Sequence, residues 1–103
     1  MKKKSKKLTQ LLLDAQKQID AHNWAAALPL MLRAKPLDEG NYGLLFRIGW
    51  AYMQLGQSDQ ARTYLEKVEG IASKNSTVLN SVGTAYIKLT LWNAALRVLL
   101  QLL

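Results

Sequence analysis

The sequence predicts an all-α protein built from three antiparallel helical hairpins, with six helices in total. The sequence repeats itself with a period of about 34 residues, which aligns Leu45 with Leu79. Within each copy, apolar residues recur three or four positions apart, as on one face of an amphipathic helix. Polar stretches separate these faces. The predicted domain covers residues 8–103, with repeats near 8–41, 42–75 and 76–103.

Two tryptophan motifs reveal the period. WAAALPLML at 24–32 and WNAALRVLL at 92–100 are separated by twice the spacing between Leu45 and Leu79. The middle copy has Ser58 at this position, and we interpret Trp24 and Trp92 as packing residues at the turn into the second helix. Self-similarity of this length is typical of stacked helical repeats. When the second copy is aligned with the third, seven of its residues fall on identical residues. In order, the second copy has Leu45, Gly49, Ala51, Tyr52, Leu55, Ala61 and Leu65, and the third has Leu79, Gly83, Ala85, Tyr86, Leu89, Ala95 and Leu99.

The helices follow in order along each copy, most clearly in the second. The sequence GQSD at 56–59 interrupts the apolar pattern, and Ser58 or Asp59 can cap the helix that follows. In the first copy, Pro29 falls inside the expected second helix. Proline lacks an amide hydrogen and crowds the preceding turn, so we predict a kink or a late helix start there. The two apolar faces of the second copy are Leu45, Ile48, Tyr52 and Leu55, then Ala61, Leu65 and Val68.

The spacing of these residues resembles the tetratricopeptide repeat, a helix–turn–helix unit of about 34 residues. Ile48-Gly49, Tyr52 and Ala61 stand at the family's motif positions, and the third copy matches similarly. The first copy departs, because Ala15 replaces the glycine. The resemblance implies a right-handed superhelix in which paired helices cross closely at the small residues Gly49, Gly83, Ala61 and Ala95.

The resemblance also implies a concave groove lined by the first helix of each repeat. Phe46, Trp50 and Met53 would form its apolar centre, suited to a protein or peptide ligand with apolar anchors. The chain would then act as an adaptor or a chaperone-like scaffold. The alternative is that these side chains only pack between neighbouring helices. The expected groove residues are Leu12, Gln16, Ile19, Phe46, Trp50, Met53, Asn80, Thr84 and Ile87.

One subclass of partner is disfavoured. Some tetratricopeptide relatives bind the acidic tails of heat-shock chaperones with a carboxylate clamp of Lys, Asn, Asn, Lys and Arg. This sequence does not supply that set, so such tails are not expected as partners. The residues at the clamp positions are Leu12, Gln16, Arg47, Thr77 and Ser81.

The last helix suggests a second possibility. Helical arrays usually end on a helix with a polar outer face, because the last repeat otherwise exposes its stacking surface. Here the third copy ends in a leucine-rich stretch without such a polar face. We therefore expect either a homodimeric scaffold that associates through this helix, or a fragment of a longer protein. The expected contact residues are Leu96, Leu99, Leu100, Leu102 and Leu103.

Charge and composition bound the remaining functions. The net charge is +7, but five lysines within residues 1–7 account for most of it. We expect a flexible basic tail there, with contact to nucleic acid or an anionic surface as a weaker alternative. There is no cysteine, and the one histidine, His22, is a turn residue. No catalytic set, cofactor motif, metal site or membrane span is expected, and a cytoplasmic location is the default.

Overall fold

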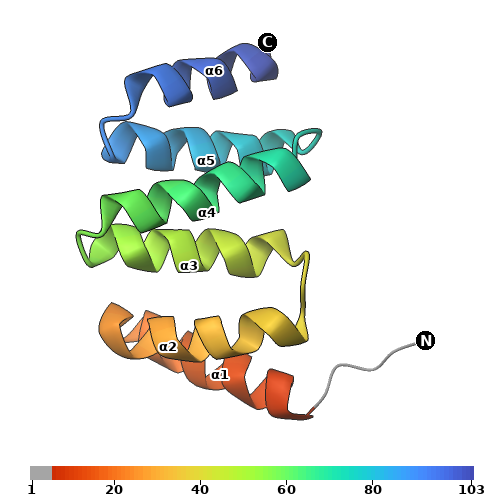
Figure 1. Cartoon of the computed structure of the whole chain (residues 1–103), viewed down its shortest axis with the longest axis vertical. Coiled ribbons are helices and arrows are strands. Elements are labelled where there is room, and N and C mark those ends of the chain that lie inside the picture. The colour runs from red at the N-terminus through yellow and green to blue at the C-terminus, as the bar shows by residue number, and fades with distance from the viewer. Residues whose placement is uncertain (1–5) are drawn as a thin grey trace.

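The structure, a computed structural model that describes residues 6–103, is a stack of helical hairpins (Figure 1). The all-α prediction is confirmed, since residues 6–103 form six α-helices, one short 3-10 helix and no strand. Helix α1 begins at Lys6, inside the expected tail, and Lys2, Lys3 and Lys4 lie outside the described residues. The helices are α1 Lys6–Asp20, α2 Trp24–Ala34, α3 Tyr42–Gln54, α4 Ser58–Ile71, α5 Ser76–Lys88 and α6 Trp92–Leu102, and the 3-10 helix η1 spans Lys35–Leu37.

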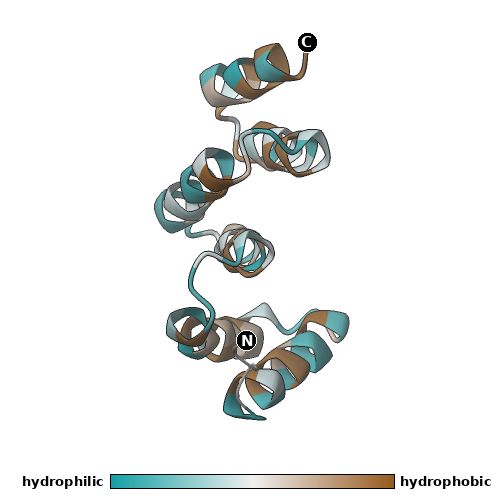
Figure 2. Cartoon of the chain, turned by 90° about the vertical axis from the view of Figure 1, so that its right-hand side faces the viewer, coloured by the Kyte–Doolittle hydropathy of each residue, from teal (hydrophilic) through white to brown (hydrophobic). Residues whose placement is uncertain are grey.

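The helices pair and stack in chain order. Helix α1 packs on α2, α3 on α4 and α5 on α6, while α2 on α3 and α4 on α5 join successive hairpins. Viewed roughly along the helix axes, the first helices of the hairpins lie on one side of the stack and the second helices on the other (Figure 2). Helices α3 and α5 begin at Tyr42 and Ser76, where the second and third copies were expected to start.

Two apolar cores run through the stack, and α3 contributes to both. Helices α1, α2 and α3 enclose the first core, and α3 to α6 enclose the second. Neighbouring positions on α3 divide between them, since Leu44 and Ile48 belong to the first core and Leu45 belongs to the second. Because α3 is buried on two sides, only its remaining side can take part in binding.

Small residues set the distance between α3 and α4. A Cβ atom added at Gly49 would lie 3.3 Å from Tyr64 Cβ and 3.4 Å from the Ala61 carbonyl oxygen. The close approach expected at Gly49 and Ala61 is therefore present. The next hairpin is similar, since a Cβ at Gly83 would meet Val98 Cγ1 at 3.4 Å.

The turn inside each hairpin repeats one unusual backbone conformation. His22, Gly56 and Thr90 occupy equivalent positions in the three copies, and all have positive φ, at 58°, 77° and 58°. The residue after each one donates its amide hydrogen to a carbonyl five positions back, at 2.8 to 2.9 Å. This is the pattern of a Schellman helix end, which favours glycine at the left-handed position. Only the second copy has that glycine.

Asparagines begin several of the helices. Asn41 and Asn75, which are equivalent in successive copies, each accept a backbone hydrogen bond of 3.1 Å at the start of α3 and α5. Asn23 caps α2 in the same way. The predicted cap at Ser58 or Asp59 is wrong, because Gln57 occupies the cap position of α4 without a side-chain hydrogen bond and Ser58 is already helical.

Of the two outcomes predicted at Pro29, a kink or a late helix start, the late start does not occur. Helix α2 begins at Trp24 and continues through Pro29 to Ala34. Pro29 is exposed, and a ring on the solvent side of a helix does not disturb the apolar packing. The buried side chains around it, Leu28 and Met31, hold α2 against its neighbours.

A hydrogen-bonded cluster around Glu69 attaches α6 to the stack. Glu69 on α4 accepts hydrogen bonds from Tyr86 Oη at 2.9 Å, from Arg97 Nη2 at 2.7 Å and from Gln101 Nε2 at 3.2 Å. The bond with Arg97 lowers the pKa of Glu69 despite its partial burial. Burial and the bond to Glu69 raise the pKa of Tyr86, which keeps its phenol protonated.

Replacing Thr90 with glycine should stabilise the protein. A β-branched residue at positive φ is strained, and glycine adopts this conformation without steric cost. We expect Thr90→Gly to raise the free energy of unfolding by up to about 1 kcal/mol, measured by urea denaturation, because relief of the left-handed strain outweighs the added entropy of the unfolded chain. Gly56→Ala is the matched control and should lower it. A destabilised Thr90→Gly variant would contradict this account of the turn.

The Glu69 cluster should make stability depend on pH. Because the folded-state pKa of Glu69 is lowered from its ordinary value of 4.5, its stabilisation is present above that pH and is lost as pH falls through the folded value. We expect Glu69→Gln to lose about 1–3 kcal/mol of stability at neutral pH. The difference in free energy of unfolding between wild type and variant should become smaller as the pH is lowered, measured by denaturation at several pH values. A gap that stays constant down to acid pH would argue against an ionised Glu69 as the source.

Candidate functional site

A pocket of about 430 Å³ opens on the side of the stack formed by the first helices of the hairpins. Its walls come from α1, the start of α2, α3 and α5, so residues that are far apart in the sequence meet there. The lining residues are Gln16, Ile19, Trp24, Phe46, Arg47, Trp50, Asn80, Ser81 and Thr84.

The apolar wall of the pocket is mainly aromatic. Phe46 and Trp50 are one helical turn apart on α3, with ring centroids 5.9 Å apart and planes tilted by 31°. Both are half-buried and pack against the second core. Ile19 and Trp24 complete the wall and pack against the first core. Trp24 therefore lines the pocket as well as packing, which the sequence interpretation missed.

The polar part of the lining comes mostly from α5. The Ser81 and Thr84 hydroxyls donate to carbonyl oxygens of their own helix, at 3.3 Å and 3.0 Å. Their oxygen lone pairs remain available as acceptors, and Asn80 adds an amide. Arg47 on α3 contributes a guanidinium group. The lining thus combines aromatic rings with hydrogen-bonding groups.

The structure gathers six of the nine expected groove residues around this pocket. Three lie elsewhere: Leu12 packs against the first core, Met53 is half-buried on α3, and Ile87 is exposed on α5. The expected groove residues did not include Trp24, Arg47 and Ser81. Arg47 and Ser81 nevertheless stand at clamp positions, so the family resemblance contained a signal for them, whereas the place of Trp24 depends on how the hairpins stack. The six that line the pocket are Gln16, Ile19, Phe46, Trp50, Asn80 and Thr84.

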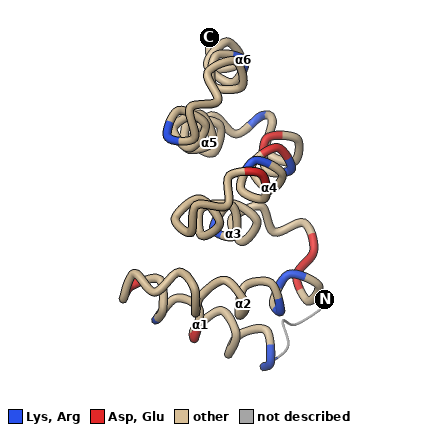
Figure 3. The backbone as a smooth tube through the Cα atoms, turned by 60° about the vertical axis from the view of Figure 1, so that its left-hand side comes forward, with Lys and Arg blue, Asp and Glu red and all other residues tan. Residues whose placement is uncertain are grey.

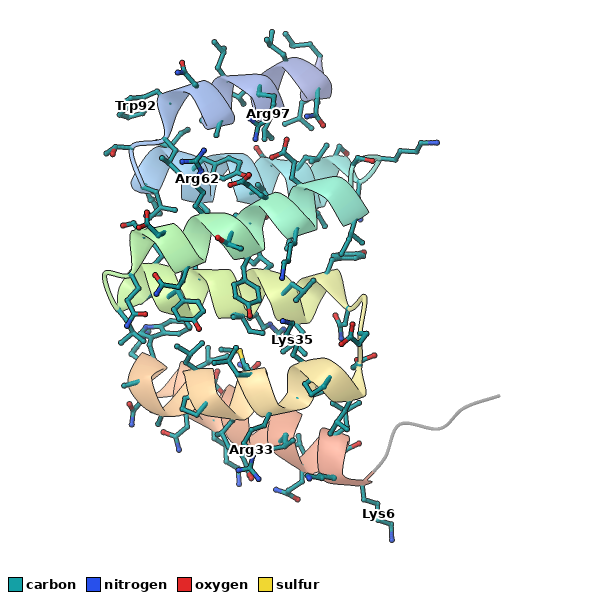
Figure 4. The ribbon with its side chains drawn as sticks, viewed as in Figure 1. Lys6, Arg33, Lys35, Arg62, Trp92 and Arg97 are labelled. Atoms are coloured by element: carbon teal, nitrogen blue, oxygen red, sulfur yellow. The ribbon has the colours of Figure 1, made fainter. Side chains whose placement is uncertain are left out.

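The outer face of α6 is apolar and exposed. Trp92 is 62% exposed, so its interpretation as a packing residue is wrong, and Figure 4 shows it projecting from the start of α6. Leu96 and Leu100 are 56% and 60% exposed, and Leu99 and Leu103 are exposed as well. Leu102 instead packs against the second core. Four of the five leucines expected to mediate self-association therefore face outward.

Other kinds of site find little support in the described part of the chain. Among residues 6–103, no three His, Cys, Asp or Glu side chains are placed to hold a metal ion. In the same range, no helix has both the length and the hydrophobicity that a membrane crossing requires.

Comparison with protein families identifies the central hairpin. Residues 42–75, which contain α3 and α4, match the tetratricopeptide repeat family. Comparison with curated proteins gave no match. The matched repeat and the six-helix stack fit a tetratricopeptide repeat protein, a class of scaffolds for protein–protein interaction. The predicted resemblance is confirmed, and the matched range coincides with the second copy found from the sequence.

Proposed function

We propose that this chain is a non-catalytic, chaperone-like or adaptor module that binds an apolar segment of a partner protein in the pocket between α1, α3 and α5. The observation that carries the proposal is the pair Phe46 and Trp50, two large aromatic side chains left half-exposed at the wall of a 430 Å³ pocket. Aromatic side chains that become buried when a partner binds often supply most of the binding energy at an interface.

The repeat itself argues against a purely structural role for these aromatics. The positions equivalent to Phe46 and Trp50 are Asn80 and Thr84 in the third copy. Both of those residues are polar and exposed, yet the third hairpin still packs. The third hairpin has no following hairpin within residues 6–103, but the first hairpin does, and there Gln16 stands at the position of Trp50. Stacking on the next hairpin therefore does not require an aromatic residue at that position, which supports a binding role for Trp50 in the second copy.

Truncating the aromatic pair should remove binding while leaving the fold intact. A suitable probe is a phage-displayed library of linear peptides selected on the wild-type protein. We expect the selected peptides to bind Trp50→Ala and Phe46→Ala at least about 30-fold more weakly, as for other interface hot spots, measured by isothermal titration calorimetry.

Trp92→Ala is the matched control, because it removes an equally large, exposed aromatic that lies outside the pocket. It should bind the selected peptides with wild-type affinity. Circular dichroism checks that every variant remains helical. Peptides that bind Trp50→Ala and Phe46→Ala as tightly as wild type would refute the groove proposal.

A second candidate function, self-association through α6, rests on a comparison between repeats. Leu96 and Leu99 correspond to Leu28 and Met31 of α2, which hold the equivalent positions in the first copy and are buried. In α2 this face packs in the first core, which α3 shares. Its equivalent on α6 is exposed, and an apolar patch of this kind commonly marks an interface.

Light scattering coupled to size-exclusion chromatography tests this second candidate. At high micromolar concentration we expect the wild-type chain to elute as a dimer. Leu96→Glu should be monomeric, because pairing would bury its charge without a partner. Leu13→Glu, which alters an exposed leucine on α1, is the control and should remain dimeric. A wild-type monomer would rule out this mode of assembly.

A further inference from the structure

We propose that the groove selects segments in which an aromatic or large aliphatic anchor stands next to an aspartate or glutamate. This inference rests on the proposed function, because it specifies the chemistry of the ligand at the same pocket. Arg47 is the residue that would pair with the ligand's carboxylate, and Lys88 would add to the attraction.

Two of the three groove helices, α3 and α5, carry charges of one sign only, whereas α1 carries both signs. These two helices contain no acidic residue, and their only charged side chains are Arg47 and Lys88. Three of the chain's seven acidic residues lie on α4, which faces the other side of the stack (Figure 3). Asp20 on α1 is the acidic group nearest in sequence to the lining residue Ile19, and Gln16 donates it a hydrogen bond of 2.8 Å.

In the described part of the chain, Arg47 is unpaired. Within residues 6–103 it makes no hydrogen bond or ion pair, although it is one of the pocket's lining residues. The other arginines of the second and third hairpins are engaged, since Arg62 pairs with Glu66 at 3.0 Å and Arg97 pairs with Glu69 at 2.7 Å. A guanidinium group carries five donors and no acceptor, and a carboxylate matches its geometry in a bidentate pair.

The position of Arg47 relative to the aromatics favours a particular order of groups in the ligand. Arg47 directly follows Phe46 in the sequence and lies one helical turn before Trp50, so the guanidinium is adjacent to the anchor site. An anchor seated on these rings would bring the neighbouring side chain of its own peptide toward Arg47. Lys88 Nζ lies 6.0 Å from the centroid of the Trp50 ring, which places a second positive charge at the same wall.

An aromatic surface with cations could also stack a nucleic-acid base and pair with its phosphate. The groove favours a peptide because its apolar wall includes the aliphatic Ile19 and because α3 and α5 together supply only two cations. The match to a protein-binding repeat points the same way.

The experiment uses two blocked tripeptides that differ only in charge. Acetyl-Glu-Trp-Glu-amide and acetyl-Gln-Trp-Gln-amide are titrated into the full chain at low salt, and two-dimensional NMR of the tryptophan indoles and the Arg47 side chain follows binding. We expect the acidic peptide to bind about two- to fivefold more tightly, as for an exposed ion pair. That preference should fall in Arg47→Gln and disappear in Arg47→Gln/Lys88→Gln.

Arg62→Gln is the matched control, because it removes the same charge from the other side of the stack, and it should keep the preference. Equal binding of the two peptides, or a preference that survives in the double variant, would overturn this inference while leaving the apolar groove intact. Failure of both peptides to bind wild type would count against the proposed function itself. Tighter binding of a ten-nucleotide oligothymidylate, lost in Arg47→Gln, would overturn the inference in favour of nucleic acid.

Discussion

The close crossing of α3 and α4 is the contact on which the rest of the structure depends. Gly49 lets the α3 backbone approach Tyr64 and Ala61 so closely that even one added carbon would meet them at 3.3 to 3.4 Å. Because α3 is fixed there and also contributes Leu44 and Ile48 to the first core, its orientation about its own axis is set. The remaining side of the helix then carries Phe46, Arg47 and Trp50 into the groove.

The repeat works through backbone geometry as much as through packing. A left-handed residue recurs at the turn of every hairpin, although only Gly56 suits that conformation. The first and third copies keep the turn with His22 and Thr90, which shows that tertiary packing outweighs a local strain of about 1 kcal/mol. The Glu69 cluster plays a comparable part at the end of the stack, where Arg97 and Gln101 of α6 donate hydrogen bonds to Glu69 of α4. Tyr86 of α5 donates to the same carboxylate.

The groove is assembled from parts that the sequence separates widely. Gln16 and Thr84 line the same pocket although Gln16 lies on α1, in the first hairpin, and Thr84 lies on α5, in the third. The register of the repeat identified most of the lining because equivalent positions on α1, α3 and α5 face the same side. The repeat register did not predict Trp24, which begins α2. The list of expected groove residues also left out Arg47 and Ser81, which follow predicted positions by one residue and stand at the clamp positions. The number of positions that each helix exposes depends on crossing angles, which a repeat pattern does not encode.

By itself, the sequence determined the number of hairpins, their boundaries and the class of protein. It did so because apolar spacing and small residues at a fixed period leave few other ways to bury the chain. The tertiary structure alone decided which tryptophans are exposed. Trp24 and Trp92 occupy equivalent positions, yet one is half-buried beside the groove and the other is 62% exposed on α6. The difference arises because Trp24 packs against the first core, to which α3 contributes, whereas Trp92 projects from the start of α6 and packs against neither core.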